Sequence, residues 1–208
     1  KILEKLKVDG ITLHLREDRR HIIDKDVIRV IKETNLPVNL EMAATEEMQN
    51  IATDLVPNAV CLVPERREER TTEGGLDVIS EEKKLKSFLR PLTEKKIRIS
   101  LFVSPELKQI EAASRVGATI VELNTGTFCD LLIEEKKEEY LAEFEKLTKA
   151  ANFGNKLGLE IHGGHGLTYE SVKYIASIPE MIELNIGHFL ISEAVFDGIE
   201  KTINTMRL

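Results

Sequence analysis

The feature that most constrains the fold of this chain is a regular alternation of short apolar runs and longer charged stretches. The apolar runs are bounded by turn residues, as buried parallel strands are. They are Ile11–Leu15, Val38–Met42, Ala59–Pro64, Arg98–Val103, Thr119–Asn124, Leu159–Gly163 and Met181–Gly187. The charged stretches have helical apolar spacing and are Asp24–Asn35, Glu46–Leu55, Ser80–Leu92, Pro105–Val116, Glu134–Leu157, Tyr169–Ser177 and Ser192–Met206. Strict alternation of this kind predicts a parallel sheet covered by helices.

Two α/β architectures fit the alternation: a doubly wound open sheet and a (β/α)₈ TIM barrel. No G-x-G-x-x-G follows a predicted strand, which counts against a dinucleotide-binding open sheet. We therefore predict a single (β/α)₈-barrel catalytic domain over residues 1–208. The first strand is apparently absent from the chain as given, because only seven strands are predicted and Lys1–Lys7 resembles the end of a first helix.

Residues at the predicted helix ends support these boundaries. Thr45, Ser104 and Thr168 stand where side-chain N-caps belong. Gly117 and Gly158 stand where helix C-caps belong, because glycine adopts the left-handed conformation that ends many helices.

Composition narrows the functional class. The net charge of −7 does not favour a nucleic-acid partner, since such domains usually carry a basic face. No apolar run reaches about 18 residues and no signal-peptide core opens the chain, so we expect no membrane association and a cytoplasmic location. Cys61 and Cys129 form no C-x-x-C pair, and we interpret both as reduced thiols rather than as a disulfide or zinc site.

The histidines are few, and all of them follow or end predicted strands: His14, His21, His162, His165 and His188. In a (β/α)₈ barrel the catalytic groups lie at the C-terminal ends of the strands and in the loops that follow. The positions of these five histidines therefore favour a barrel whose catalytic end carries functional side chains. His162 is the histidine that we interpret as a candidate structural residue.

Two glutamates lie inside predicted strands. Period two puts Glu41 on the face of Asn39, and Glu122 on the face of Asn124. A glutamate in a buried strand is costly unless it is paired or neutral. One interpretation is a structural ion pair with lysine or arginine. The other is a general acid/base whose pKa is shifted by burial and by neighbours.

Anion-binding residues are predicted at two places. Arg16 follows a strand end, where a guanidinium can grip phosphate, whereas the rest of HLREDRRH (Glu17, Asp18, Arg19 and Arg20) has the pattern of a solvated loop. Gly166 and the pair Gly187–His188 end the last two strands, the usual phosphate site of such barrels. The long loop Glu65–Asp77 is either a surface excursion or, as we favour, a lid hinged at its glycines.

Several motifs follow one another along nearly the whole chain: HLREDRRH, NLEM, VPE with TTEGGLD, SLF, VELNTG, GHGLTY and IPEMIELNIGH. Together, in this order, they resemble the pyridoxine 5′-phosphate synthase family. The resemblance implies the joining of 1-deoxy-D-xylulose 5-phosphate to 3-amino-2-oxopropyl phosphate, without a metal or redox cofactor. The products would be pyridoxine 5′-phosphate, inorganic phosphate and water. It also implies a homo-oligomer, an octamer in this family.

The resemblance further implies residue roles. His14 and Glu41 would accept protons, His165 would donate one, and Glu122 would stabilise the transition state. Substrate-binding residues would be Arg16, His21 and Thr71 for the deoxyxylulose phosphate, and Gly166, Gly187 and His188 for the phosphate of the amino-ketone. The family's first-strand Asn-x-Asp-His motif and the arginine after it are absent here, and His162 stands where a small or amide residue is expected.

Two other functions fit part of the pattern. A metal-dependent sugar-phosphate aldolase or epimerase could use His14, His165, His188 and Glu41 as zinc ligands. A non-catalytic sugar-phosphate-binding barrel would need the anion sites but not Glu41.

Overall fold

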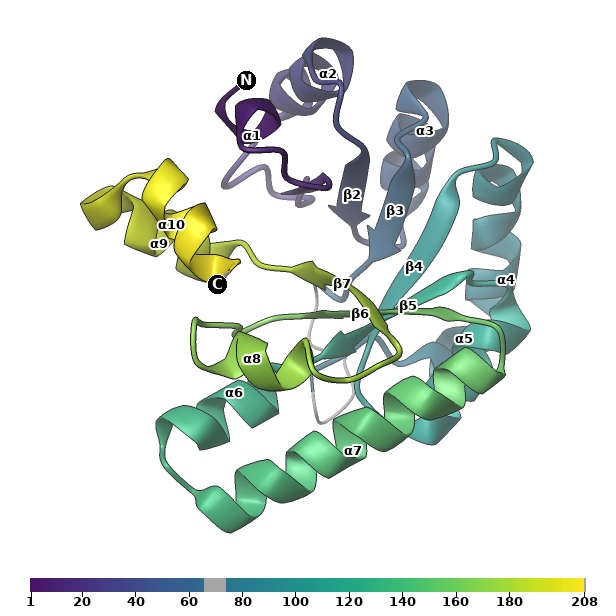
Figure 1. Ribbon diagram of the computed structural model, residues 1–208. Coiled ribbons are helices and arrows are strands. Elements are labelled where there is room, and N and C mark those ends of the chain that lie inside the picture. The colour runs from purple at the N-terminus through teal and green to yellow at the C-terminus, as the bar shows by residue number, and fades with distance from the viewer. Residues whose placement is uncertain (66–73, 208) are drawn as a thin grey trace.

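The computed structural model describes residues 1–65 and 74–207. Its centre is a sheet of seven parallel strands that follow one another in chain order from β1 to β7. The strands are β1 Ile11–His14, β2 Val38–Met42, β3 Ala59–Leu62, β4 Arg98–Val103, β5 Ile120–Asn124, β6 Glu160–Gly164 and β7 Met181–Asn185. The sheet curls, and the helices cover its outer side (Figure 1). The predicted α/β barrel with one strand missing is confirmed, and each predicted strand is present.

The helices are α1 Ile2–Lys5, α2 Asp24–Glu33, α3 Glu46–Leu55, α4 Val78–Glu94, α5 Leu107–Val116, α6 Gly126–Ile133, α7 Lys137–Lys156, α8 Ser171–Ile175, α9 His188–Asp197 and α10 Ile199–Met206. Two differences from the sequence prediction matter. Helix α6 was not predicted, because its apolar residues have no amphipathic period. The helix predicted at the C-terminus is two helices, because Gly198 breaks it with φ +79°.

The predicted helix caps hold at three positions and fail at one. The Thr45 hydroxyl accepts a hydrogen bond from the backbone of Met48, and Gly117 ends α5 with φ +95°. Gly158, with φ +81°, follows the end of α7 as predicted. Ser104 was wrongly predicted as a cap: α5 begins two residues beyond Pro105, and the buried Ser104 hydroxyl has no hydrogen-bond partner among the described residues.

The fifth capping prediction, at Thr168, is supported in part by local contacts. Its hydroxyl accepts a hydrogen bond from the backbone N–H of Ser171 at 3.3 Å. Helix α8 begins at Ser171 itself, so the hydroxyl reaches the first residue of the helix rather than its second or third.

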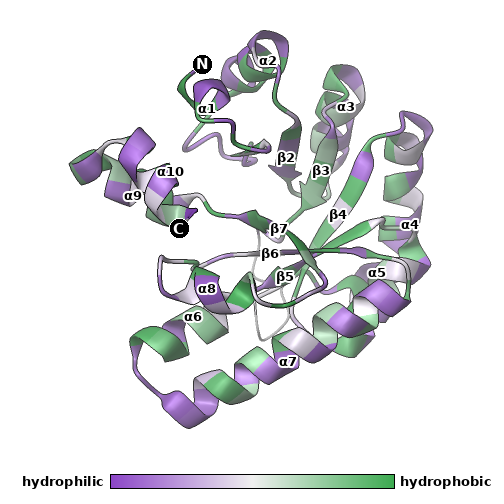
Figure 2. Ribbon diagram, in the orientation of Figure 1, coloured by the Kyte–Doolittle hydropathy of each residue, from purple (hydrophilic) through white to green (hydrophobic). Residues whose placement is uncertain are grey.

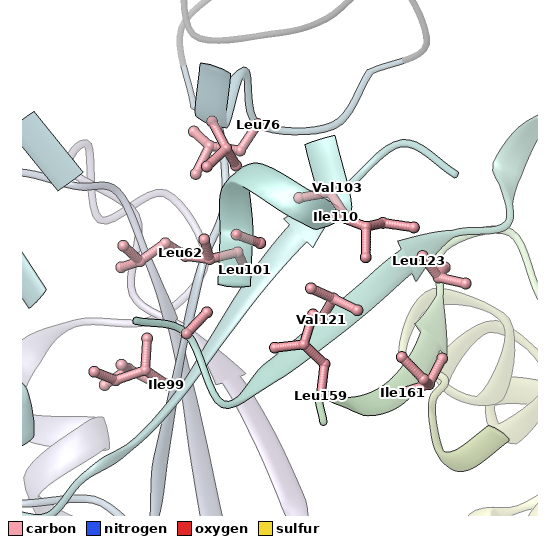
Figure 3. Close-up of a cluster of buried hydrophobic side chains, with 14 of the residues drawn as sticks. Leu62, Leu76, Ile99, Leu101, Val103, Ile110, Val121, Leu123, Leu159 and Ile161 are labelled. Carbon is pink, nitrogen blue, oxygen red and sulfur yellow. The ribbon is translucent and has the colours of Figure 1, made fainter. Parts of the chain in front are cut away.

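The apolar core lies between the sheet and the helices. Leu101 and Val121 are adjacent on neighbouring strands, and both point to the helical side, where they meet α5 residues such as Ile110 (Figure 3). The helices carry alternating hydrophobic and hydrophilic bands, as amphipathic cover requires (Figure 2). Because strand side chains alternate, the opposite face of the same strands points into the barrel.

The two edge strands of the sheet are β1 and β7, and the eighth strand position of a barrel lies between them. Four large apolar side chains near the β7 edge are exposed: Ile182, Ile191, Val195 and Phe196. The thiols of Cys61 and Cys129 are free, as predicted, and both are buried. None of the helices in the described ranges is long and apolar enough to cross a membrane.

Candidate active site inside the barrel

Strand register brings three polar side chains together inside the barrel. His14 is the register partner of Glu41, and Glu41 is the partner of Cys61 on the next strand. Register partners share a face of the sheet, so these side chains all point inward. His14 Nδ1 lies 3.6 Å from Glu41 Oε2. The two residues predicted as proton acceptors are thus neighbours.

Glu122 lies deeper on β5 and is 3% exposed. Its carboxylate accepts a hydrogen bond from Asn185 Nδ2 at 2.9 Å. Burial and the nearby charge of Glu41 raise the pKa of Glu122 to about 8. Burial also raises the pKa of Glu41, and the charge of His14 opposes this rise. At neutral pH both carboxyl groups therefore favour the protonated form more than ordinary glutamates do.

The alternative that Glu41 and Glu122 are structural ion pairs with lysine or arginine has no support in the described ranges. No lysine or arginine there lies within 4.0 Å of either carboxylate. Gly164 makes room for Glu122, since a Cβ at that glycine would lie 2.1 Å from Glu122 Oε1. Asn185 is itself held by Thr12, whose hydroxyl donates to its side-chain oxygen at 2.7 Å.

Sequence reasoning missed Glu65 as a partner of His14. Glu65 Oε1 lies 3.0 Å from His14 Nε2, and the Glu65 side chain is only 4% exposed. Its other oxygen accepts a hydrogen bond from the backbone N–H of Glu17 at 3.0 Å. The sequence signal for Glu65 is its position just after β3, on the catalytic side, although the pattern alone places it in the predicted loop Glu65–Asp77. Asn185 was also missed, although it lies in a predicted strand.

His165 lies at the mouth, just after β6. It is an exposed residue with φ +79°, a rare conformation for a side chain larger than glycine. Its ring centroid lies 6.2 Å from that of Phe102, and a Cβ at Gly126 would lie 2.7 Å from its ring. The Thr125 hydroxyl donates to its carbonyl at 2.6 Å. These contacts hold an unusual backbone, which is typical of functional positions.

The predicted anion-binding residues lie around the same end of the sheet. Arg16 follows β1 and its Nε donates to Asp18 at 3.3 Å, and His21 is exposed in the same loop. Gly166 follows His165 with φ +79°. Gly187 and His188 begin α9 beyond β7, and both are exposed. Thr71 and most of the loop predicted as a lid lie outside the described residues.

The rest of the HLREDRRH loop is not uniformly solvated. Asp18 and Arg20 pair with each other at the surface, as expected of a solvated loop. Arg19 differs, because its side chain is 20% exposed and pairs with Asp24 and Glu47. It therefore connects this loop to α2 and α3. The prediction of a merely solvated side chain is wrong for Arg19.

His162 lies below the site on the same inward face of β6. It is 3% exposed, and its ring nitrogens lie 2.8 Å from Glu160 and 3.4 Å from Glu183. Arg98 also donates to Glu160 at 2.6 Å. Hydrogen bonds from His162 and Arg98 outweigh the effect of burial and keep the pKa of Glu160 below its usual range. His162 is thus the buried member of a cluster whose other members, Arg98, Glu160 and Glu183, are partly exposed, in keeping with a structural histidine.

The metal-dependent alternative needs several ligands at one place. Within residues 1–65 and 74–207, no group of three or more His, Cys, Asp or Glu side chains is arranged to hold a metal ion. The interior instead presents a histidine and carboxyl groups with raised pKa values at the C-terminal ends of parallel strands. That arrangement defines an enzyme of the βα-barrel class that moves protons.

Comparisons with known proteins identify the family. The profile of the family described as "Pyridoxal phosphate biosynthesis protein PdxJ" matches residues 1–208, and the chain belongs to this family. It is 54% identical to pyridoxine 5′-phosphate synthase of Roseobacter denitrificans, over 100% of this chain and 83% of the relative. It is 52% identical to the enzyme of the same name in Ruegeria pomeroyi, over 100% of this chain and 84% of the relative. The chain is therefore a synthase of vitamin B6 biosynthesis.

Among solved structures, the fold resembles a 3-keto-L-gulonate-6-phosphate decarboxylase from Vibrio cholerae. The TM-score is 0.62 at 10% identity, and the match covers 99% of this chain and 86% of that one. At this identity the likeness concerns the fold alone.

Proposed function

We propose that the chain condenses 1-deoxy-D-xylulose 5-phosphate with 3-amino-2-oxopropyl phosphate and closes the pyridine ring of pyridoxine 5′-phosphate. Inorganic phosphate and water leave. The names of the relatives support the product, and the sequence motifs that resemble the family support the two substrates. The residues of the chain perform the proton transfers, and we propose no cofactor.

The observation that carries this proposal is the pairing of His14 with Glu41 inside the barrel, at 3.6 Å. Ring closure requires imine formation, loss of phosphate, enolisation and dehydration, and each step moves a proton. An imidazole titrates near neutral pH, and the raised pKa of Glu41 moves its carboxyl group toward the same range. We assign both as proton acceptors, with His165 at the mouth as the proton donor.

Glu122 fits a different task. Because its pKa is about 8, its carboxyl group is mostly protonated at pH 7 and can donate a hydrogen bond. A neutral donor in a buried position stabilises negative charge that develops on a substrate oxygen. We therefore assign Glu122 as the transition-state stabiliser, held in place by Asn185.

The phosphate groups have separate proposed sites. Arg16, His21 and Thr71 would bind deoxyxylulose phosphate beside β1. Gly166, Gly187 and His188 would bind the amino-ketone phosphate beside β6 and β7. The start of α9 supports the second site, since Gly187 precedes the first turn and backbone N–H groups at a helix N-terminus favour anions. We further propose one catalytic domain that acts in the cytoplasm as a homo-octamer, without nucleic-acid or membrane partners.

The test is an assay of the full-length protein with both substrates, measuring pyridoxine 5′-phosphate. We expect turnover that survives a chelator and protein that contains no stoichiometric metal. Zinc at one per chain with chelator-sensitive activity would support the aldolase or epimerase class instead. The variant Glu41→Gln separates catalysis from binding: we expect bound substrate without turnover, whereas a binding protein would show no turnover before the substitution either.

A further inference from the structure

The imidazole of His14 stands between two carboxyl groups on neighbouring parts of the barrel mouth. Its Nε2 lies 3.0 Å from Glu65 Oε1, and its Nδ1 lies 3.6 Å from Glu41 Oε2. A neutral imidazole carries one N–H and one lone pair. Only one of its nitrogens can therefore accept a proton, and the neighbours decide which one.

The contact with Glu65 has hydrogen-bond length, and the contact with Glu41 does not. Glu65 is also the more rigid partner, because its side chain is 4% exposed and its Oε2 accepts from the backbone N–H of Glu17. That second bond aims Oε1 at the histidine ring. Glu41 has the opposite tendency: burial raises its pKa, so its carboxyl group more readily holds a proton of its own.

We propose that Glu65 is a positioning residue that keeps the proton of neutral His14 on Nε2 and leaves Nδ1 as the atom that accepts protons. This deepens the proposed function and rests on His14 being a proton acceptor there. Nδ1 faces Glu41, so the acceptor atom is next to the second proposed acceptor. The Glu65 carboxylate also stabilises the imidazolium that forms when Nδ1 takes a proton, as an acid beside a catalytic histidine does elsewhere.

The same contacts connect three neighbouring strands at the mouth. His14 ends β1, Glu41 lies on β2, and Glu65 follows β3. Through its bond to the Glu17 backbone, Glu65 joins the loop after β3 to the loop after β1, which carries Arg16. Glu65 thus contacts both the ring of His14 and the backbone of the loop after β1, which Arg19 also holds through Asp24 and Glu47.

The test uses the full-length protein labelled with ¹⁵N in its histidine rings. Nitrogen chemical shifts distinguish the two tautomers, and the variant His14→Gln identifies the resonances that belong to His14. We expect the Nε2–H tautomer in the unmodified protein above the pH at which His14 loses its charge. In Glu65→Leu we expect a mixed population or the Nδ1–H tautomer.

Kinetics supply the second measurement. We expect Glu65→Leu to lower kcat by about 100-fold or more with KM changed far less, because wrong tautomers block proton transfer without removing substrate contacts. Glu65→Gln keeps an oxygen that can accept from Nε2–H, so it should restore the tautomer and part of kcat. Glu106→Gln is the matched control: this exposed glutamate follows β4 and pairs with Lys146, and its loss should change neither readout.

Two results would overturn the proposal: a His14 proton on Nδ1 in the unmodified protein, or an unchanged tautomer and kcat in Glu65→Leu. If Glu65→Leu does not fold, the His14 tautomer in the unmodified protein and in Glu65→Gln still tests the proposal. If the protein forms no pyridoxine 5′-phosphate at all, the proposed function fails, while the tautomer of His14 still reports on Glu65.

Discussion

Two histidines in this barrel each stand between two glutamates, and they differ in exposure, in the cations beside their glutamates and in how the pKa of a neighbouring glutamate is shifted. The His14 side chain is 28% exposed, and its neighbour Glu41 has no cation but the histidine beside it in the described structure. The His162 side chain is 4% exposed, and its neighbour Glu160 is also held by Arg98. The pKa of Glu41 is raised, mainly by burial, whereas that of Glu160 is lowered by its partners.

The comparison teaches that residue types alone do not make an active site. At His162, each ring nitrogen has a glutamate neighbour, and Glu160 is also held by Arg98. At His14, burial opposes the ionisation of Glu41, and no lysine or arginine of the described residues lies within 4.0 Å of that carboxylate. Shifted pKa values of this kind are typical of functional sites.

The largest expected difference concerns activity. Replacement of His14 by asparagine should lower kcat by about 10²- to 10⁴-fold, because the proposed proton acceptor is lost. Steady-state assays of pyridoxine 5′-phosphate formation measure this. The matched variant His162→Asn should keep kcat within a few-fold. Equal losses in the two variants would remove the distinction between the two clusters.

The next effect is on the pH dependence of stability. The pKa of Glu122 is raised from 4.5 to about 8 in the folded state. Between these values the folded chain holds a proton that the unfolded chain lacks, so stability is complete below about pH 4.5 and falls as pH rises through 8. The variant Glu122→Gln has no carboxyl group to ionise, so it does not lose this stability. At pH 9 it should be more stable than the unmodified protein, by up to about 5 kcal/mol.

Denaturant unfolding at pH 4 and pH 9 measures that change. The two proteins should have similar stability at pH 4, where the glutamate is protonated in both states. A wild-type protein whose stability does not fall between pH 6 and pH 9 would contradict the raised pKa.

A smaller effect on stability is expected for the contacts around His162. His162→Asn removes contacts to Glu160 and Glu183 and leaves Arg98 on Glu160. We expect thermal unfolding to report a loss of about 1–2 kcal/mol, since a buried group is removed while its partners reach solvent. A gain in stability would show that the cluster is strained rather than satisfied.

The smallest effect is expected for Arg98→Leu. The Arg98 side chain is 48% exposed and that of Glu160 is 35% exposed, so water screens much of their attraction. We expect a loss below about 1 kcal/mol, smaller still at high salt. A loss as large as that of His162→Asn would show that Arg98, rather than the histidine, holds the cluster together.

Much of the site was predictable because strand residues alternate and catalytic groups gather at one end of a barrel. Glu41 and Glu122 stood out as acids inside apolar strands, and His14 stood out at a strand end. Glu65 did not, because an acid just past a strand in a charged loop has the pattern of a solvated residue. Its burial depends on the neighbouring loop that carries Glu17, and no local pattern contains that contact.

The sequence alone determined the alternating α/β fold, the strands and the end of the barrel where the polar residues gather, because period and turn chemistry are local properties. It also predicted which acids point inward. Only the tertiary structure decided that His14 meets Glu65 as well as Glu41, and that His162 lies between Glu160 and Glu183. Those distinctions depend on register, depth and burial, which arise when strands distant in sequence lie side by side.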